Sequence, residues 1–97
     1  MDLEQIYRVK NDSFVIRKVM DEMVLVPLVN NVADMTSVIT LNDTAASIIE
    51  NLDGKNTLKD VILQLFTIYN VKEELLERDV IIFITDALSK GVIEPLA

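Results

Sequence analysis

The side chains that most enzymes use for acid–base and nucleophilic chemistry are missing from this sequence. Its 97 residues include no histidine and no cysteine, which removes the commonest general base, thiol nucleophiles and zinc–thiolate sites. Asp79 and Asp86 are seven residues apart, about two turns along one face of a predicted helix. Nothing in the spacing of the carboxylates indicates convergent oxygens that would hold a metal ion. The sequence therefore predicts a protein that is not an enzyme and that needs no metal or cofactor.

The charge balance argues against nucleic acid and anionic membrane surfaces as partners. The chain has 9 basic and 16 acidic residues, a net charge of −7, whereas a phosphate backbone is bound through clustered lysine and arginine. The longest uninterrupted apolar run, Met23 to Val29, is far shorter than the ~20 residues that cross a bilayer. The N-terminal segment mixes charges and has no apolar run of signal-peptide length. We therefore expect a soluble, cytoplasmic protein.

One α+β domain covering residues 1–97 is predicted, with three N-terminal antiparallel strands followed by three helices. Hydrophobic residues make up 51% of the chain, enough for one core in a domain of this length. Runs rich in β-branched residues at Phe14–Val19 and Met23–Val29 are separated by a short polar step, which predicts a hairpin. Ser37–Leu41 reads as a third strand. Within it, the bulkier side chains of Ile39 and Leu41 are expected to face the helices.

Capping residues predict where the first two helices begin. Asn42 or Asp43 can cap the first helix, and Gly54 suits the left-handed conformation that ends it. Thr57 and Asp60 resemble a capping box at the start of the second helix.

The third helix is predicted from about Lys72 or Glu73 to Lys90, because Gly91 follows as a stop. On a 3.6-residue wheel, one broad stripe belongs to the core: Leu76, Val80, Phe83, Ile84, Ala87 and Leu88. After Gly91, Val92 and Ile93 either form a short terminal strand or pack over the core.

Two apolar residues of the third helix lie outside this stripe. Leu75 and Ile82 fall together on the opposite side, between Asp79 and Asp86, and these four residues are called the ridge below. An apolar ridge flanked by carboxylates on a solvated face has to be covered by something. The N-terminal hairpin and a partner molecule are the two alternatives.

The order and spacing of several short motifs resemble the PqqD family. LNDTAASIIENLDG is similar to the family's central signature, a strand ending in Leu-Asn, a short helix and an Asp-Gly stop. The remaining motifs follow in the family's order: a helix opening at Thr57, Tyr-Asn-Val at Tyr69–Val71, ERDV at Glu77–Val80 and LSKGVI at Leu88–Ile93. Upstream, FVIRKV and MVLVPL look like the family's paired first strands.

The resemblance covers about residues 14 to 93, with one departure. Many members carry tryptophan at the position of Ile49. The departure leaves the fold intact, changes the core volume and weakens an assignment to the pyrroloquinoline quinone pathway itself.

The resemblance implies a winged-helix-like fold, also called the RiPP recognition element, and the function of a peptide chaperone. In the family, the leader segment of a ribosomal precursor peptide adds as a strand to the edge of the third strand, in a cleft with the third helix. A partner enzyme, often a radical SAM protein, then modifies the core peptide. An edge strand offers unpaired N–H and C=O groups to such a peptide. By position, the peptide-binding residues are then Val38, Ile39 and Thr40 of the strand and Leu75, Asp79, Ile82 and Asp86 of the helix.

Two other functions stay open at this stage. A winged-helix DNA binder is disfavoured, because the expected third helix has more acidic than basic residues and would repel phosphates. The strands are also expected to precede all three helices, unlike the usual order in such proteins. The stronger alternative is self-association, since a homodimer formed through the edge strand or the ridge would cover the same features.

Overall fold

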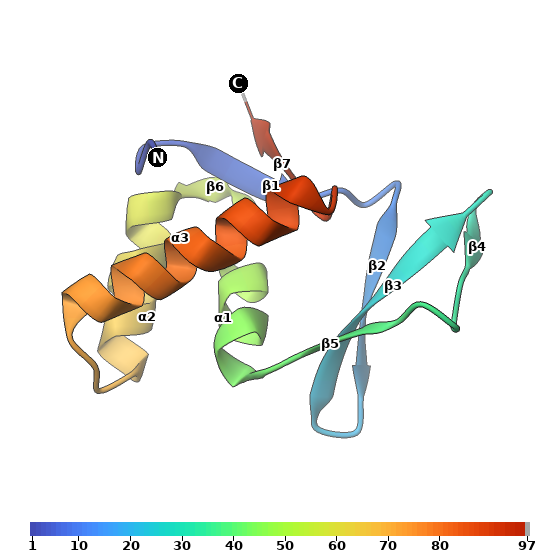
Figure 1. Ribbon diagram of the computed structural model, residues 1–97, viewed down its shortest axis with the longest axis horizontal. Coiled ribbons are helices and arrows are strands. Elements are labelled where there is room, and N and C mark those ends of the chain that lie inside the picture. The colour runs from blue at the N-terminus through green and yellow to red at the C-terminus, as the bar shows by residue number, and fades with distance from the viewer. Residues whose placement is uncertain (97) are drawn as a thin grey trace.

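Residues 1–96, which this computed structural model describes, form two antiparallel sheets and three helices (Figure 1). Along the chain the elements are β1 (Ile6–Val9), β2 (Phe14–Val19), β3 (Glu22–Val29), β4 (Val32–Ala33), β5 (Ile39–Leu41), α1 (Asp43–Asn51), β6 (Asp53–Thr57), α2 (Leu58–Ile68), α3 (Glu73–Ser89) and β7 (Ile93–Leu96). None of the helices described here is long and apolar enough to cross a membrane.

The predicted hairpin and third strand form the larger sheet. β2 pairs with one side of β3, and β4 and β5 pair with the other side, all antiparallel. This confirms the α+β class with antiparallel N-terminal strands followed by three helices. The third strand begins at Ile39 rather than Ser37, because a turn occupies the preceding loop. The Asp34 carboxylate accepts hydrogen bonds from the hydroxyl and the N–H of Thr36, at 2.6 and 3.0 Å, and these bonds lower the pKa of Asp34.

The smaller sheet has the strand order β6-β1-β7. Of its strands the sequence indicated only β7, which begins at Ile93 where a short terminal strand was one of the two alternatives. β1 pairs regularly with β7, but its register with β6 is irregular. Gly54 lies in the irregular part of β6 with a φ of 80°, so its predicted left-handed conformation is present. Gly54 is a residue of β6, however, and does not end α1, which already ends at Asn51. The expectation that all strands precede the helices is wrong, since β6 lies between α1 and α2 and β7 follows α3.

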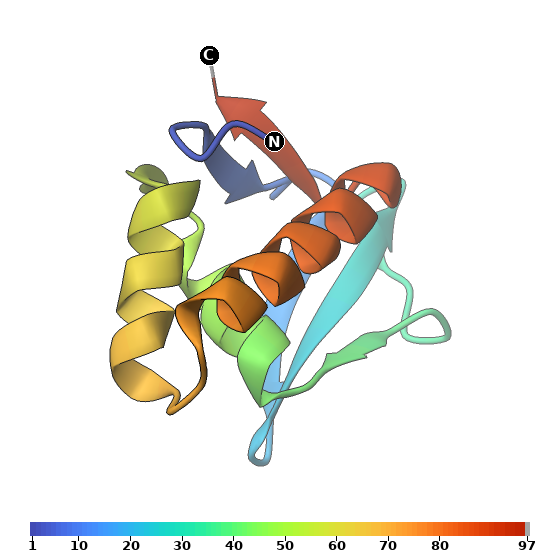
Figure 2. The same cartoon turned by 60° about the vertical axis from the view of Figure 1, so that its left-hand side comes forward.

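The three helices meet in one core, as the apolar periodicities predicted. In Figure 1 and Figure 2, α1 lies between α2 and the larger sheet, and α3 crosses over α1. The predicted stripe of α3 divides into two groups. Leu76, Val80, Ile84 and Ala87 are buried, whereas Phe83 and Leu88 pack at the margin of the core. The first helix is capped by Asn42, whose side chain accepts a hydrogen bond from the Ala45 N–H at 2.8 Å.

The capping box at the start of α2 is expected to contribute measurably to stability. Thr57 Oγ1 accepts from the Asp60 N–H at 3.1 Å, and the Asp60 carboxylate accepts from the Thr57 N–H at 3.0 Å. Thr57→Ala should lower the free energy of unfolding by about 1 kcal/mol, measured by urea denaturation. Thr67→Ala, at the exposed end of the same helix, is the matched control. An equal loss of unfolding free energy in both variants would show that the capping box does not contribute the stability.

Candidate functional site

β5 is an edge strand with one free side. It pairs with β3 at Met23↔Leu41, Val24↔Thr40 and Leu25↔Ile39, and no strand within residues 1–96 pairs with its other side. Its side chains follow the predicted alternation, because Leu41 is buried and Ile39 packs against the core while Thr40 is exposed. Val38, predicted as part of this strand, lies just before it and is half-buried.

The backbone of Thr40 is directed to the free side. Along a strand, the N–H and C=O of one residue point to the same side, and the next residue points to the other. On β3, the Leu28 N–H donates to Ser13 on the β2 side, while the Pro27 C=O accepts from Asp34 on the β5 side. The backbone N–H and C=O groups of even-numbered β3 residues are therefore directed to β2, and those of odd-numbered residues are directed to the side of β4 and β5. It follows that Ile39 and Leu41 bond to β3, and that Thr40 presents its N–H and C=O to an incoming strand.

The other edge of the larger sheet is less suited to strand addition. β2 pairs with β3 alone, but it carries the exposed cations Arg17 and Lys18. Charged side chains, lysine above all, protect natural sheet edges against pairing. β5 contains only Ile39, Thr40 and Leu41 and therefore has no such protection.

A small cleft opens between the start of α1 and α3, next to the end of β5. Its volume is about 250 Å³. Asn42, the residue after β5, lines it together with Thr44, Ala45 and Ile48 of α1 and with Asp79 and Phe83 of α3. The lining of the cleft is therefore mixed, with apolar side chains from Ala45, Ile48 and Phe83 and one carboxylate from Asp79.

The ridge on α3 is exposed. Leu75 is 44% and Ile82 is 60% exposed, so the N-terminal hairpin does not cover them and that alternative is wrong. Asp79 is three residues before Ile82 and therefore its neighbour on the helix surface, which joins the ridge to the cleft. Asp86 forms an ion pair with Lys90 at 3.0 Å. Of the four ridge residues, Asp79 alone lines the cleft.

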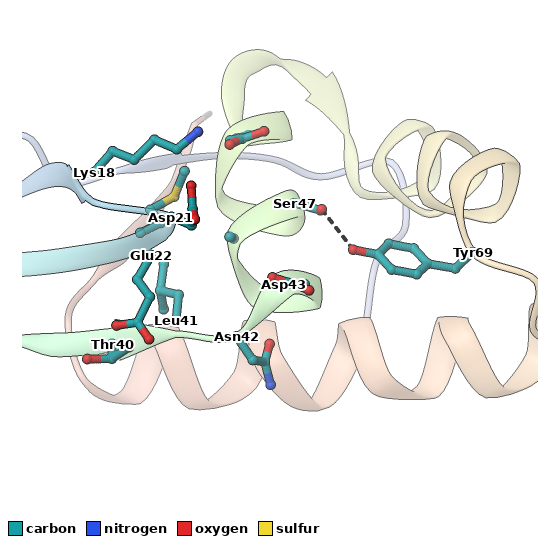
Figure 3. A pocket seen from close by; sticks show the side chains of 12 residues that line it. Lys18, Asp21, Glu22, Thr40, Leu41, Asn42, Asp43, Ser47 and Tyr69 are labelled. Carbon is teal, nitrogen blue, oxygen red and sulfur yellow. Dashed lines mark hydrogen bonds between the residues drawn. The ribbon is translucent and has the colours of Figure 1, made fainter.

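A larger, acidic groove lies on the other side of the junction between β5 and α1 (Figure 3). Its volume is about 780 Å³, and the turn of the β2–β3 hairpin forms one wall. The groove is lined by the carboxylates of Asp21, Glu22, Asp43 and Glu50. Lys18 is the one cation among its lining residues. The hydroxyls of Ser47 and Tyr69 hydrogen bond to each other at 3.0 Å on the far side. Asn42 lines both this groove and the cleft, so the two hollows meet at the end of β5.

Most of the chain, from residue 22 to residue 93, matches a known protein family. The family described as Coenzyme PQQ synthesis protein D (PqqD) matches residues 22–93. The chain belongs to the PqqD family. The match runs from β3 into β7 and includes the free edge of β5 and all of α3.

Two solved structures share the fold of this PqqD-family chain. One is described as lasso peptide synthetase B1 complexed with the leader peptide: it is 26% identical, has a TM-score of 0.74, and the comparison covers 92% of this chain and 98% of that one. The other is TbiB1 in complex with the TbiA(beta) leader peptide, 20% identical with a TM-score of 0.75, covering 93% and 98%. Among curated proteins, none matches the chain.

Sequence reasoning missed two contributors to the cleft of this PqqD-family chain. Phe83 was assigned to the core stripe, yet it is half-buried and lines the cleft. Its place at the margin of the stripe, on the side of Asp79, was the available signal. Asn42 was identified as a cap, and its position directly after the edge strand was the signal for a second role.

Proposed function

We propose that this chain is a non-catalytic peptide chaperone. It captures the leader segment of a ribosomally synthesised precursor peptide by strand addition to β5 and presents the precursor to a modifying enzyme. The observation that carries the proposal is the free edge of β5, a strand without charged residues of its own, where the Thr40 N–H and C=O are directed outward next to the cleft with α3. The similarity to a lasso peptide synthetase B1 complexed with the leader peptide supports the binding of a leader.

The side chains of α3 have to supply much of the affinity. A micromolar complex corresponds to about −8 kcal/mol, whereas a strand hydrogen bond contributes only ~1 kcal/mol net. A few bonds to Thr40 and its neighbours therefore fall short. Burial of apolar surface contributes roughly 25 cal/mol per Å². The exposed Leu75 and Ile82 and the half-buried Phe83 offer such surface on α3.

The partner in this proposal is an enzyme that modifies the precursor, such as a radical SAM protein, in the cytoplasm. The pathway belongs to the class of ribosomally synthesised, modified peptides. Pyrroloquinoline quinone is one such product, but Ile49, which replaces the tryptophan common in the family, is buried in the core and weakens that assignment.

Titration of the ¹⁵N-labelled chain with the leader segment of the neighbouring precursor gene tests the function. We expect saturable amide shifts concentrated in Ile39–Leu41, the start of α1 and the ridge side of α3, with micromolar affinity. Shifts concentrated in the Phe14–Val29 hairpin would contradict the proposed site. A chain that forms a dimer and loses it on Ile82→Asp, without binding the leader, would favour self-association instead.

A further inference from the structure

Two buried valines of β3 do not belong to the core. Val24 and Val26 are 6% and 2% exposed, yet neither is part of the cluster that joins the helices to the sheets. Leu25, between them, is part of that cluster. Since successive side chains of a strand point to opposite faces, Val24 and Val26 lie on the outer face of the larger sheet, away from the helices.

These valines form the floor of an apolar groove of about 450 Å³. The other lining residues come from β2, from the end of β3 and from the segment around β4: Val15, Arg17, Lys18, Val19, Leu28, Asn31, Ala33 and Met35. Met35 is 67% exposed. Met20, in the turn between β2 and β3, is also exposed. Exposed apolar surface of this kind marks interaction sites in soluble proteins.

The groove carries the opposite charge to the rest of the molecule. The chain has 16 acidic and 9 basic residues, but the only charged side chains lining this groove are Arg17 and Lys18. Lys18 also lines the acidic groove, so Arg17 is the cation that belongs to the outer groove alone. Within residues 1–96 the Arg17 guanidinium has no ion pair and no hydrogen bond. Arg17 lies opposite Val24 across the β2–β3 ladder, so the free cation and the valine floor are on the same face.

We propose that this outer groove is a second docking site, for an extended aliphatic segment of a partner protein that carries a carboxylate. The aliphatic side chains would pack on Val24, Val26 and Leu28, and the carboxylate would bind Arg17, whose planar guanidinium suits bidentate contact. The groove is separate from the free edge of β5, so leader and partner can be held together. The choice of the modifying enzyme as this partner rests on the proposed function. The groove and its chemistry are independent of that function.

Charge argues against a second copy of the chain as the occupant. A two-fold, face-to-face dimer places the same patch of both copies in contact. Because the patch has basic side chains and no acidic one, such a dimer would bring two positively charged patches together, and like charges repel. A heterologous partner with acidic character has no such penalty.

Two blocked nonapeptides of alternating residues, one of Val and Glu and the other of Val and Lys, test the proposal. Each is titrated to millimolar concentration into the ¹⁵N-labelled chain, with and without leader peptide. We expect the Val/Glu peptide to shift the amides of Val15, Val24, Val26 and Leu28, and the Val/Lys peptide to bind about tenfold more weakly. Arg17→Glu should cost about tenfold, whereas Lys59→Glu, the same charge change on an exposed residue of α2, should have little effect.

Several results would overturn the docking site. They are equal binding of the two peptides, equal losses in Arg17→Glu and Lys59→Glu, absence of shifts at millimolar peptide, or shifts confined to β5 and α3. A dimer in sedimentation that Arg17→Glu dissociates would make a second copy the occupant. The proposed function is tested separately by the leader titration at β5 and α3. If the leader does not bind there, the amide shifts expected in the outer groove are unchanged.

Discussion

Ile82→Asp is expected to abolish leader binding while the chain stays folded. Ile82 is 60% exposed on α3 and makes no part of the core, so a polar side chain is tolerated there in the free protein. In the complex, the new carboxylate would lie under the apolar side chains of the bound leader. An uncompensated buried charge costs roughly 3–5 kcal/mol, which corresponds to a loss of affinity of more than about 100-fold. Isothermal titration calorimetry with the leader peptide measures the loss.

Leu63→Asp is the matched control for this prediction. Leu63 is an apolar residue of α2 with 44% exposure, and it lines neither the cleft nor either groove. The two variants therefore carry the same new charge on a comparably exposed helix position. We expect both to melt close to the wild type, by circular dichroism, and Leu63→Asp alone to bind the leader normally. Normal binding by Ile82→Asp would exclude the ridge from the site.

The parts of the fold that could be predicted from the sequence depend on local interactions. The Asn42 cap, the Thr57–Asp60 capping box and the stop at Gly91 all involve residues within three or four positions of each other. The chemistry of such short segments is visible in sequence, because a cap needs an oxygen at one position and a stop needs a left-handed residue. The buried stripe of α3 is equally local, since it follows from helical periodicity alone.

Two strands of the smaller sheet, β1 and β6, escaped prediction because they exist through pairing with distant segments. β1 has four residues, too few for a reliable alternation, although its Tyr7 and Val9 are buried as alternation requires. β6 reads DGKNT and contains no apolar residue, so no pattern in it predicts a strand. It becomes one because β1 is placed against it, with β7 on the other side.

The candidate site was predictable in outline and not in detail. The resemblance and the wheel of α3 indicated Thr40, Leu75 and Ile82, which lie at a free edge and on an exposed face. Their part in peptide binding stays a prediction. Which backbone groups of β5 face outward depends on the register of the β2–β3 hairpin, which no local pattern fixes. The cleft beside Phe83 depends on how α3 crosses α1, and crossing geometry is a property of packed helices rather than of one segment.

Methyl groups on the backbone nitrogens of the leader are expected to weaken binding with a period of two. In a strand added to β5, alternate leader residues bond to the free edge and the others face away. A methyl group at a bonding position removes a hydrogen bond and leaves an acceptor such as the Thr40 C=O unsatisfied. That costs about 1–3 kcal/mol, or roughly five- to 150-fold in affinity. A methyl group at a non-bonding position should change affinity little, as a fluorescence anisotropy series would show.

A hydrogen bond between the leader and β5 can also be removed from the side of the protein. Val38 is two residues before Thr40, so in an extended chain its N–H also points to the free side. Val38→Pro should then weaken leader binding by about fivefold or more, while Val38→Ala, which keeps the N–H, controls for the lost side chain. A thermal melt close to the wild type would show that both variants are folded. If methylation had the same effect at every leader position, and Val38→Pro bound like Val38→Ala, the leader would be held by its side chains and not as an added strand.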